Sequence, residues 1–123
     1  MLQRGSMLNV IDNTGAKEAR CICILGGFFN KSASVGSLVI VSIRRLRLVR
    51  RVKVGQVHLG VIVKTKKSIS FKDGTRSFYD KNAVVLLTRK KQILGNKILG
   101  SVSRGLRKKK FLRILLVAGN LYF

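Results

Sequence analysis

The chain has 123 residues, of which 46% are hydrophobic, and it carries 26 lysines and arginines against four acids, a formal net charge of +22. This hydrophobic share excludes a disordered basic tail, and the length predicts one domain over residues 1–123. Charge of one sign at this density destabilises a compact monomer by self-repulsion, so the sequence predicts a polyanionic partner. Nucleic acid is the leading candidate and an anionic membrane surface the second, because a solvated basic face explains only a few charges.

The first part of the chain predicts two strands joined by a turn. The run Met7–Ile11 is typical of a short strand, the turn residues 12–15 follow, and a second strand is expected over Ala19–Leu25. Cys21 and Cys23 are two apart, so a strand would place both on one face as buried thiols. Their spacing fits neither a CxxC motif nor a zinc site.

A loop over residues 28–36 contains two adjacent aromatic residues, Phe28 and Phe29. They either anchor the loop against the core or stack on bases. A β-branched run over 38–43 then passes into RRLRLVRRVKV, residues 44–54, where apolar and basic residues mostly alternate. This period of two predicts a cationic β-ribbon with a turn near 49–51, and counts against a basic amphipathic helix.

The stretch Gly60–Leu87 predicts a β-hairpin, with Asp73-Gly74 at the tip because glycine accepts a positive φ. If these two residues form the tip, partners have numbers that sum to 147. The expected pairs are Val61 with Leu86, Val63 with Val84, Lys67 with Asp80, and Ile69 with Phe78. Apolar residues would then face each other along the ladder, and a cation would face an anion. A shift of one residue would break all four pairs.

From Arg89 to Lys110 the sequence predicts a loop and short-helix region, in which Ser103 caps a short helix over 104–110. A final strand is expected over Phe111–Val117. Six to eight short strands with little helix favour a mainly β fold and a small closed barrel, because closure removes exposed sheet edges.

Catalytic groups are scarce. The single histidine, His58, has no acid near it in the sequence, and Asp12, Asp73 and Asp80 stand in turn-like contexts. No P-loop, GxSxG or HExxH motif is present. We therefore expect no enzyme, no catalytic residues, no metal site and no cofactor.

Cations that could bind phosphate are abundant on the ribbon, on the hairpin and in the C-terminal turn. The candidate RNA-binding residues are Arg44, Arg45, Arg47, Arg50, Arg51, Lys53, Lys64, Lys66, Lys67, Lys72, Arg76, Arg104, Arg107, Lys108, Lys109 and Lys110. Their spread over several elements suits a protein embedded among RNA helices, where shape and phosphates are recognised more than base edges.

Several segments of the sequence also resemble those of a known protein family. A spaced pattern begins with GVIV at 60–63, continues through Asp73-Gly74, Tyr79 and Asn82, and ends with Val85-Leu86. It is similar to the signature of the universal large-subunit ribosomal protein number fourteen. The segments MLNVIDNTGAKEARCICILGG at 7–27 and VIVKTKK at 61–67, and the tail over 94–116, also resemble that family. The resemblance covers essentially the whole chain.

The resemblance implies a closed five-stranded β-barrel with a projecting ribbon and a C-terminal region with short helices. It implies a structural protein of the large subunit that binds large-subunit rRNA. Neighbouring large-subunit proteins three and nineteen, small-subunit rRNA at an intersubunit bridge, and a ribosome-silencing factor are its expected partners. Asn96, Lys97 and Arg113 match the region associated with the silencing-factor surface.

The chain departs from the family pattern at several positions. Leu48 and Lys72 stand where relatives often have proline, and Arg45, Gly105 and Lys109 replace acids. The added positive charge favours an organellar member in the mitochondrial matrix, while a bacterial cytoplasm or a plastid stays open.

Two other classes of function would also suit a strongly basic chain. A free-standing OB-type protein that binds single-stranded nucleic acid would need an aromatic platform on its strands, for which Phe71, Phe78 and Tyr79 are the candidates. A protein of the membrane surface would need a long amphipathic helix, and the sequence shows none.

Overall fold

The computed structural model describes residues 2–26, 32–48, 51–70, 72–103, 105–106 and 111–118. The strands in these residues are β1 (Met7–Val10), β2 (Ala16–Ile24), β3 (Leu38–Leu46), β4 (Val57–Lys64), β5 (Ile69–Ser70), β6 (Arg76–Ser77) and β7 (Ala83–Leu87), and the helix is α1 (Leu112–Ala118). The protein is mainly β, as the sequence predicts.

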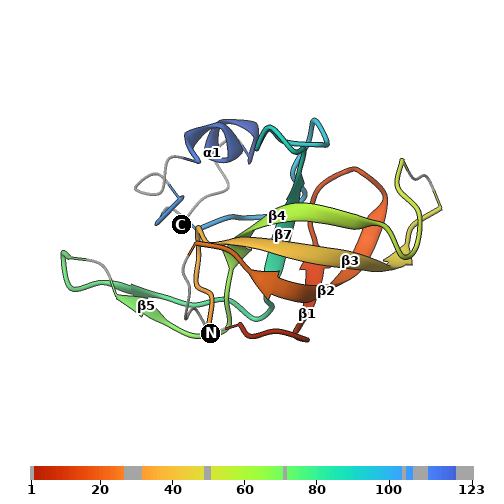
Figure 1. Cartoon of the computed structure of the whole chain (residues 1–123). Helices are drawn as coiled ribbons and strands as arrows, with labels where there is room; N and C mark the ends of the chain where they lie inside the picture. Colours follow the sequence, from red (N-terminus) through yellow and green to blue (C-terminus); the bar gives the residue numbers. More distant parts are fainter. Residues whose placement is uncertain are drawn as a thin grey trace.

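Five strands close into a barrel in the order β1-β2-β3-β4-β7 (Figure 1). Four of the pairings are antiparallel, and a short parallel pairing between β1 and β7 closes the barrel, with Asn9 opposite Ala83 and Val10 opposite Val84. The predicted five-stranded closed barrel is therefore confirmed. Each barrel strand has a hydrogen-bonded neighbour on both sides, which protects it from edge-to-edge association.

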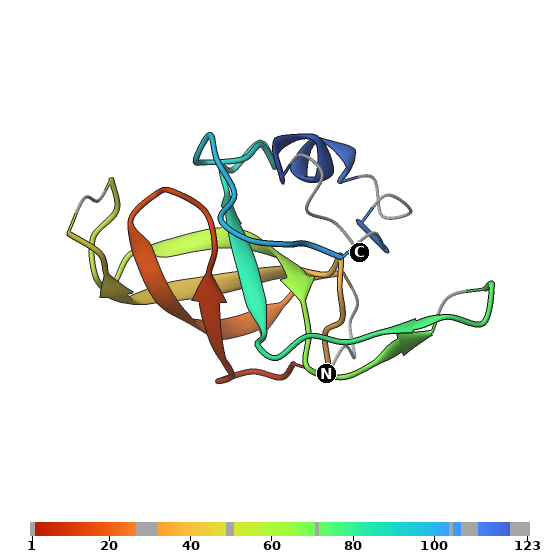
Figure 2. The same cartoon turned by 180° about the vertical axis from the view of Figure 1, so that it is seen from behind.

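Two hydrophobic cores meet at β4 and β7, which are buried on both faces. Ile62 and Leu86 belong to the core inside the barrel. Val61 and Val85 belong to a second core outside the barrel, which we call the outer core. Ile114, from the C-terminal region of the chain, belongs to it as well. This double burial explains why AVVLL in β7 is a continuous apolar run instead of an alternating one. In both side views α1 lies above the barrel beside these strands (Figures 1 and 2).

The predicted register of the hairpin is wrong by one residue. Val61 pairs with Val85 and Ile62 with Val84, so the numbers of partners sum to 146, and Val63 does not pair with Val84. Between Ile62 and Lys64 the register shifts at a bulge, which leaves Val63 as the extra residue. The side chain of Val63 is still fully buried, in the outer core.

The turn and the bulge both differ from the prediction. Ser70 pairs with Arg76, so the loop between them has an odd number of residues, 71–75, instead of the two-residue tip assumed from Asp-Gly. Asp73 Oδ1 accepts hydrogen bonds from the N–H of Thr75 at 3.1 Å and from its hydroxyl at 2.7 Å, and Gly74 has a φ of +86°. This odd loop gives partners in β5 and β6 numbers that sum to 146. Lys64 nevertheless pairs with Ala83, whose numbers sum to 147 as predicted, so the register changes again after the ribbon. The bulge at Val63 then returns the sum to 146 in the rest of β4 and β7.

Two pairings expected from that register also fail. Ile69 pairs with Ser77, and Phe78 is 73% exposed instead of packed across the ladder. Among the described residues no ion pair joins Lys67 to Asp80, and both residues are exposed.

The projecting ribbon is at a different place from the one predicted. β5 and β6 form a two-stranded sheet that extends away from the barrel (Figure 2), whereas the described part of 47–56 contains no strand. β3 instead continues to Leu46, and the loop after it packs Val52 into the barrel core at 3% exposure. The alternation fails because Leu48 and Val54, expected on the same apolar face, are 97% and 60% exposed.

The predicted strand over 111–117 is also wrong, because α1 covers 112–118. Ile114 and Leu115 are buried while Arg113 and Leu116 are exposed, which is the one-sided burial of a short helix docked on the outer core. A seven-residue apolar run does not distinguish strand from buried helix by its pattern alone. The expected helix over 104–110 lies mostly outside the described residues. Ser103, its expected cap, accepts a hydrogen bond from the N–H of Gly105 at 3.3 Å.

The first two strands and the turn between them follow the prediction closely. β2 begins earlier than expected, at Ala16. Cys21 is buried, but Cys23 is only half-buried, and both thiols are free. The register of β2 against β3 shifts between these two residues, so strict alternation of faces is lost there.

Gly60 in β4 provides a test of the packing between β4 and β7. A Cβ at this position would lie 2.7 Å from Val84 Cγ2 and 3.3 Å from the carbonyl oxygen of Val85. We expect Gly60→Ala to lower the free energy of unfolding by about 1–3 kcal/mol, because the strands must shift. Urea denaturation measures the decrease. Val84→Ala makes room, so the double variant should lose less stability than the two single variants added together. Simple additivity would contradict the close approach of Gly60 to Val84.

Candidate nucleic-acid interface

The turn over residues 12–15 is held by a buried carboxylate. Asp12 is fully buried, and its Oδ1 accepts from the Thr14 hydroxyl at 2.6 Å and from the Thr14 N–H at 3.3 Å. Its Oδ2 accepts from the N–H of Leu86 at 3.0 Å. Burial raises the pKa of Asp12, while the hydrogen bonds from Thr14 and Leu86 act in the opposite direction. The turn is thereby fixed to β7.

The next residue fixes the same turn to a C-terminal loop. Asn13 Oδ1 accepts from the N–H of Asn96 at 3.0 Å and from that of Lys97 at 3.2 Å, and its amide donates to Asn96 Oδ1. Asn96 and Lys97, two of the residues predicted to bind the silencing factor, are thus held in place with exposed side chains. The third, Arg113, is exposed on α1, and within the described part of the chain no hydrogen bond joins it to the other two.

The loop that follows β3 packs against this turn. The N–H of Arg47 donates to the carbonyl of Gly15 at 2.7 Å, and the N–H of Arg51 donates to that of Thr14 at 2.8 Å. Between loop and turn lies a hollow of about 890 Å³, which we call the turn hollow. Its lining side chains include Lys17, Arg47, Arg51, Leu46, Leu48 and Leu99. Arg47 and Arg51 are among the residues that the sequence predicts to bind RNA, and Lys17 is not. In the sequence Lys17 is marked only by its place two residues after the turn.

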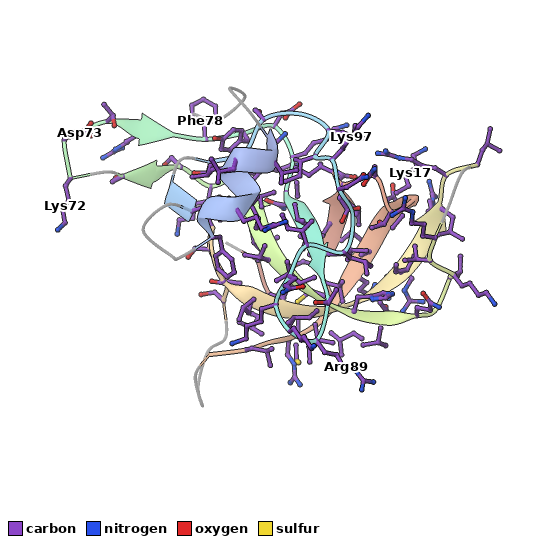
Figure 3. The ribbon with its side chains drawn as sticks, turned by 90° about the horizontal axis from the view of Figure 1, so that it is seen from above. Lys17, Lys72, Asp73, Phe78, Arg89 and Lys97 are labelled. Carbon is purple, nitrogen blue, oxygen red and sulfur yellow. The ribbon has the colours of Figure 1, made fainter. Side chains whose placement is uncertain are left out.

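The predicted RNA-binding cations that the structure describes form two groups at opposite ends of the molecule, as Lys17 and Lys72 show in Figure 3. The turn end carries Arg44, Arg45, Arg47, Arg51 and Lys53, all exposed. The hairpin end carries Lys66, Lys67, Lys72 and Arg76, all exposed, and the half-buried Lys64. The remaining candidates, Arg50, Arg104 and Arg107–Lys110, lie outside the described residues.

Acids compete with RNA for few of these cations. Within the described ranges the one ion pair joins Arg45 to Glu18, at 3.4 Å. Arg45 is 68% exposed, so water screens the pair and its contribution is small. Arg47 donates to the carbonyl of Val10 at 3.5 Å, and its charge acts to lower the pKa of the buried Asp12. The other exposed cations of the two ends form no ion pair within the described residues.

At the base of the hairpin, the cation of Lys64 lies beside an aromatic ring. Lys64 Nζ is 5.8 Å from the centre of the Tyr79 ring. Burial lowers the pKa of Lys64, and the charge of Asp80 acts in the opposite direction. The N–H of Lys66 donates to Asn82 Oδ1 at 2.8 Å, which fixes the chain where it leaves the barrel.

The structure also bears on the alternative of an OB-type protein. The described strands carry no Phe, Tyr or Trp side chain, because Phe78 and Tyr79 follow β6 instead of lying within a strand. Phe71, the third candidate, lies outside the described residues. The aromatic platform that this alternative needs is therefore not on the described strands.

The titratable groups inside the protein have structural partners. His58 is half-buried with Nε2 3.1 Å from Gln56 Oε1, and burial lowers its pKa. Burial also raises the pKa of the Cys21 thiol.

Among the described residues no group of three metal-ligating side chains comes together. The same residues include no helix of the length and hydropathy needed to cross a membrane.

These features define a small, strongly basic β-barrel protein with cationic groups at two ends, a class suited to binding nucleic acid. A family model agrees with this class and makes it specific. The chain belongs to the ribosomal protein L14p/L23e family, whose model matches residues 1–122. It is therefore a structural ribosomal protein of the large subunit, from a family that binds rRNA and other ribosomal proteins and is not a family of enzymes.

Proposed function

We propose that the protein is a structural constituent of the large ribosomal subunit whose turn end and hairpin end bind rRNA phosphates. The observation that carries this proposal is the arrangement of the cations. All but one of the ten described candidates are exposed, and they are displayed at both ends of a closed barrel that has its own buried core. Two separated groups allow the protein to join RNA helices that are apart in the folded rRNA, and so to contribute to the bridge with small-subunit rRNA.

The charge balance supports phosphate recognition more than base recognition. Four acids oppose 26 basic residues, so RNA would relieve the repulsion within the protein while its own counterions are released. The deep groove of an RNA duplex hides base edges from side chains and leaves phosphates as the accessible groups. The excess of basic residues also supports our proposal that the protein belongs to a mitochondrial ribosome.

The loop fixed by Asn13 supports a protein-binding surface. Asn96 and Lys97 are exposed while their backbone is hydrogen-bonded, so a partner would meet side chains that are already positioned. We propose that these residues, with Arg113 on α1, contact the ribosome-silencing factor. Large-subunit proteins three and nineteen are the proposed neighbours elsewhere on the surface.

Sedimentation tests the main proposal. A tagged copy expressed in cells should move with large subunits on a sucrose gradient and should remain with them through a high-salt wash. Such a wash removes basic proteins that are held by phosphate contacts alone, and should not remove a constituent that is built into the subunit. Mitochondrial and cytosolic ribosomes separated before the gradient give the compartment in the same experiment. Recovery only in the free soluble pool would contradict the proposal.

A further inference from the structure

We propose that the turn hollow binds one unpaired nucleotide of RNA, with the phosphates against Lys17, Arg47 and Arg51 and the base against the leucines. This inference rests on the proposed function, because it takes RNA as the partner, and it adds what one particular site would recognise. The hollow has about 890 Å³, within the range of roughly 300–1,000 Å³ that is usual for ligand sites and large enough for a nucleotide.

The cations of the hollow come from two segments that the fold brings together. Lys17 lies at the start of β2, whereas Arg47 and Arg51 lie in the loop after β3. Hydrogen bonds of 2.7 Å and 2.8 Å from the backbone of the two arginines to the turn hold that loop in position. No acid is among the described lining residues. The site therefore presents three cations together, and two of them are on residues whose backbone is hydrogen-bonded to the turn.

The apolar part of the hollow calls for a second kind of ligand group. Leu48 is 97% exposed and Leu99 is 46% exposed, although both line the same concave surface as the cations. Large apolar side chains in water are stabilised when a ligand covers them. A nucleotide has both required parts, an anionic phosphate and a flat base whose faces pack well on apolar side chains.

Base-paired RNA could contact the cations of the hollow but not its leucines. In a duplex the phosphates are exposed, but the bases are stacked and their faces are covered. Only an unpaired base, such as a bulge, can reach Leu48 and Leu99. The side chain of Asn13, the nearest amide, is already used by Asn96 and Lys97. We therefore expect the hollow to accept any base with little preference.

The test compares three RNA hairpins that have the same base-paired stem. One is fully paired, one has a single bulged 2-aminopurine, and one has a single bulged abasic nucleotide. The intact protein should bind the 2-aminopurine bulge about tenfold more tightly than either of the other two. The fluorescence of 2-aminopurine should rise on binding, because the base leaves the RNA stack for an aliphatic surface. Filter binding at fixed salt gives the affinities.

Variants distinguish the contribution of the leucines in the hollow from that of its cations. Leu48→Ser combined with Leu99→Ser should remove the preference for the bulge and leave the affinity for paired RNA unchanged. Val57→Ser combined with Leu116→Ser changes two apolar residues that are 58% and 71% exposed elsewhere on the protein, and should keep the preference. Lys17→Ala should weaken binding of all three RNAs, and Arg89→Ala, an exposed cation outside the hollow, should not.

Equal affinity for the three RNAs would overturn the inference while leaving phosphate binding by the rest of the protein intact. The abasic bulge binding as well as the 2-aminopurine bulge would also overturn it, because flexibility of the RNA would then explain the effect. So would displacement of the bulged RNA by an acidic, leucine-containing peptide in a manner that depends on Leu48 and Leu99, which would assign the hollow to a protein. Failure to bind any RNA would contradict the proposed function itself.

Discussion

Asp12→Ala should lower the free energy of unfolding by about 2–4 kcal/mol, among the largest effects from any single polar residue in this protein. The side chain is fully buried and accepts from the Thr14 hydroxyl, the Thr14 N–H and the Leu86 N–H. Alanine would leave these buried donors without an acceptor. Urea denaturation followed by circular dichroism measures the change.

The hairpin provides a matched control for this variant. Asp73 accepts the same two hydrogen bonds from the residue two positions later, Thr75, at 3.1 Å and 2.7 Å, but both residues are exposed. Asp73→Ala should therefore cost less than about 1 kcal/mol, because water replaces the missing acceptor. Equal decreases in stability for the two variants would show that burial of Asp12 and its bond to β7 are not what stabilises the turn.

Removal of four cations from the hairpin end should reduce affinity for large-subunit rRNA about 100-fold or more at moderate salt. The variant carries glutamine at Lys66, Lys67, Lys72 and Arg76, all of which are exposed. The plot of log affinity against log salt should become less steep by about 0.7–0.9 for each phosphate that the variant no longer neutralises. Filter binding over a series of salt concentrations gives both values.

Net charge alone must be excluded as the cause of that weaker binding. A second variant carries glutamine at four exposed cations outside both ends, Arg4, Arg20, Arg89 and Lys90, and lowers the net charge by the same four units, from +22 to +18. We expect its affinity to change much less. A decrease of equal size in both variants would mean that RNA binds the overall charge of the protein and not its hairpin.

Much of the barrel could be predicted from the sequence because its strands have local signals. The run Met7–Val10, the turn held by Asp12 and the β-branched segments of β3 and β4 each indicate their structure within a few residues. The register of the hairpin could not be predicted in the same way. It depends on whether the loop around Asp73 has an even or an odd number of residues, and Asp-Gly is compatible with both. It also depends on the bulge at Val63, which nothing in the local sequence marks.

Other errors came from residues that are distant in sequence but adjacent in the fold. The segment 44–54 alternates like a ribbon, but Val52 gains more by filling the end of the barrel than by pairing with β3. The run 112–118 is helical because an outer core formed by β4 and β7 is available to its one apolar side. Composition alone revealed the cations of the two ends, whereas the turn hollow required the fold, since Lys17 and Arg51 are 34 positions apart in the sequence.

The closure of the barrel also sets the order in which the chain can fold. Asp12 accepts a hydrogen bond from a residue 74 positions later, and Asn13 accepts hydrogen bonds from residues 83 and 84 positions later. Until β7 leaves the ribosome that synthesises the chain, β1 has an unpaired edge and Asp12 Oδ2 has no donor. Asn13 Oδ1 lacks its two donors until the loop after β7 has also emerged. Pairings of such long range slow folding and expose strand edges in the meantime. We therefore expect the N-terminal half to remain open during synthesis and to become resistant to protease only after about residue 98 has emerged.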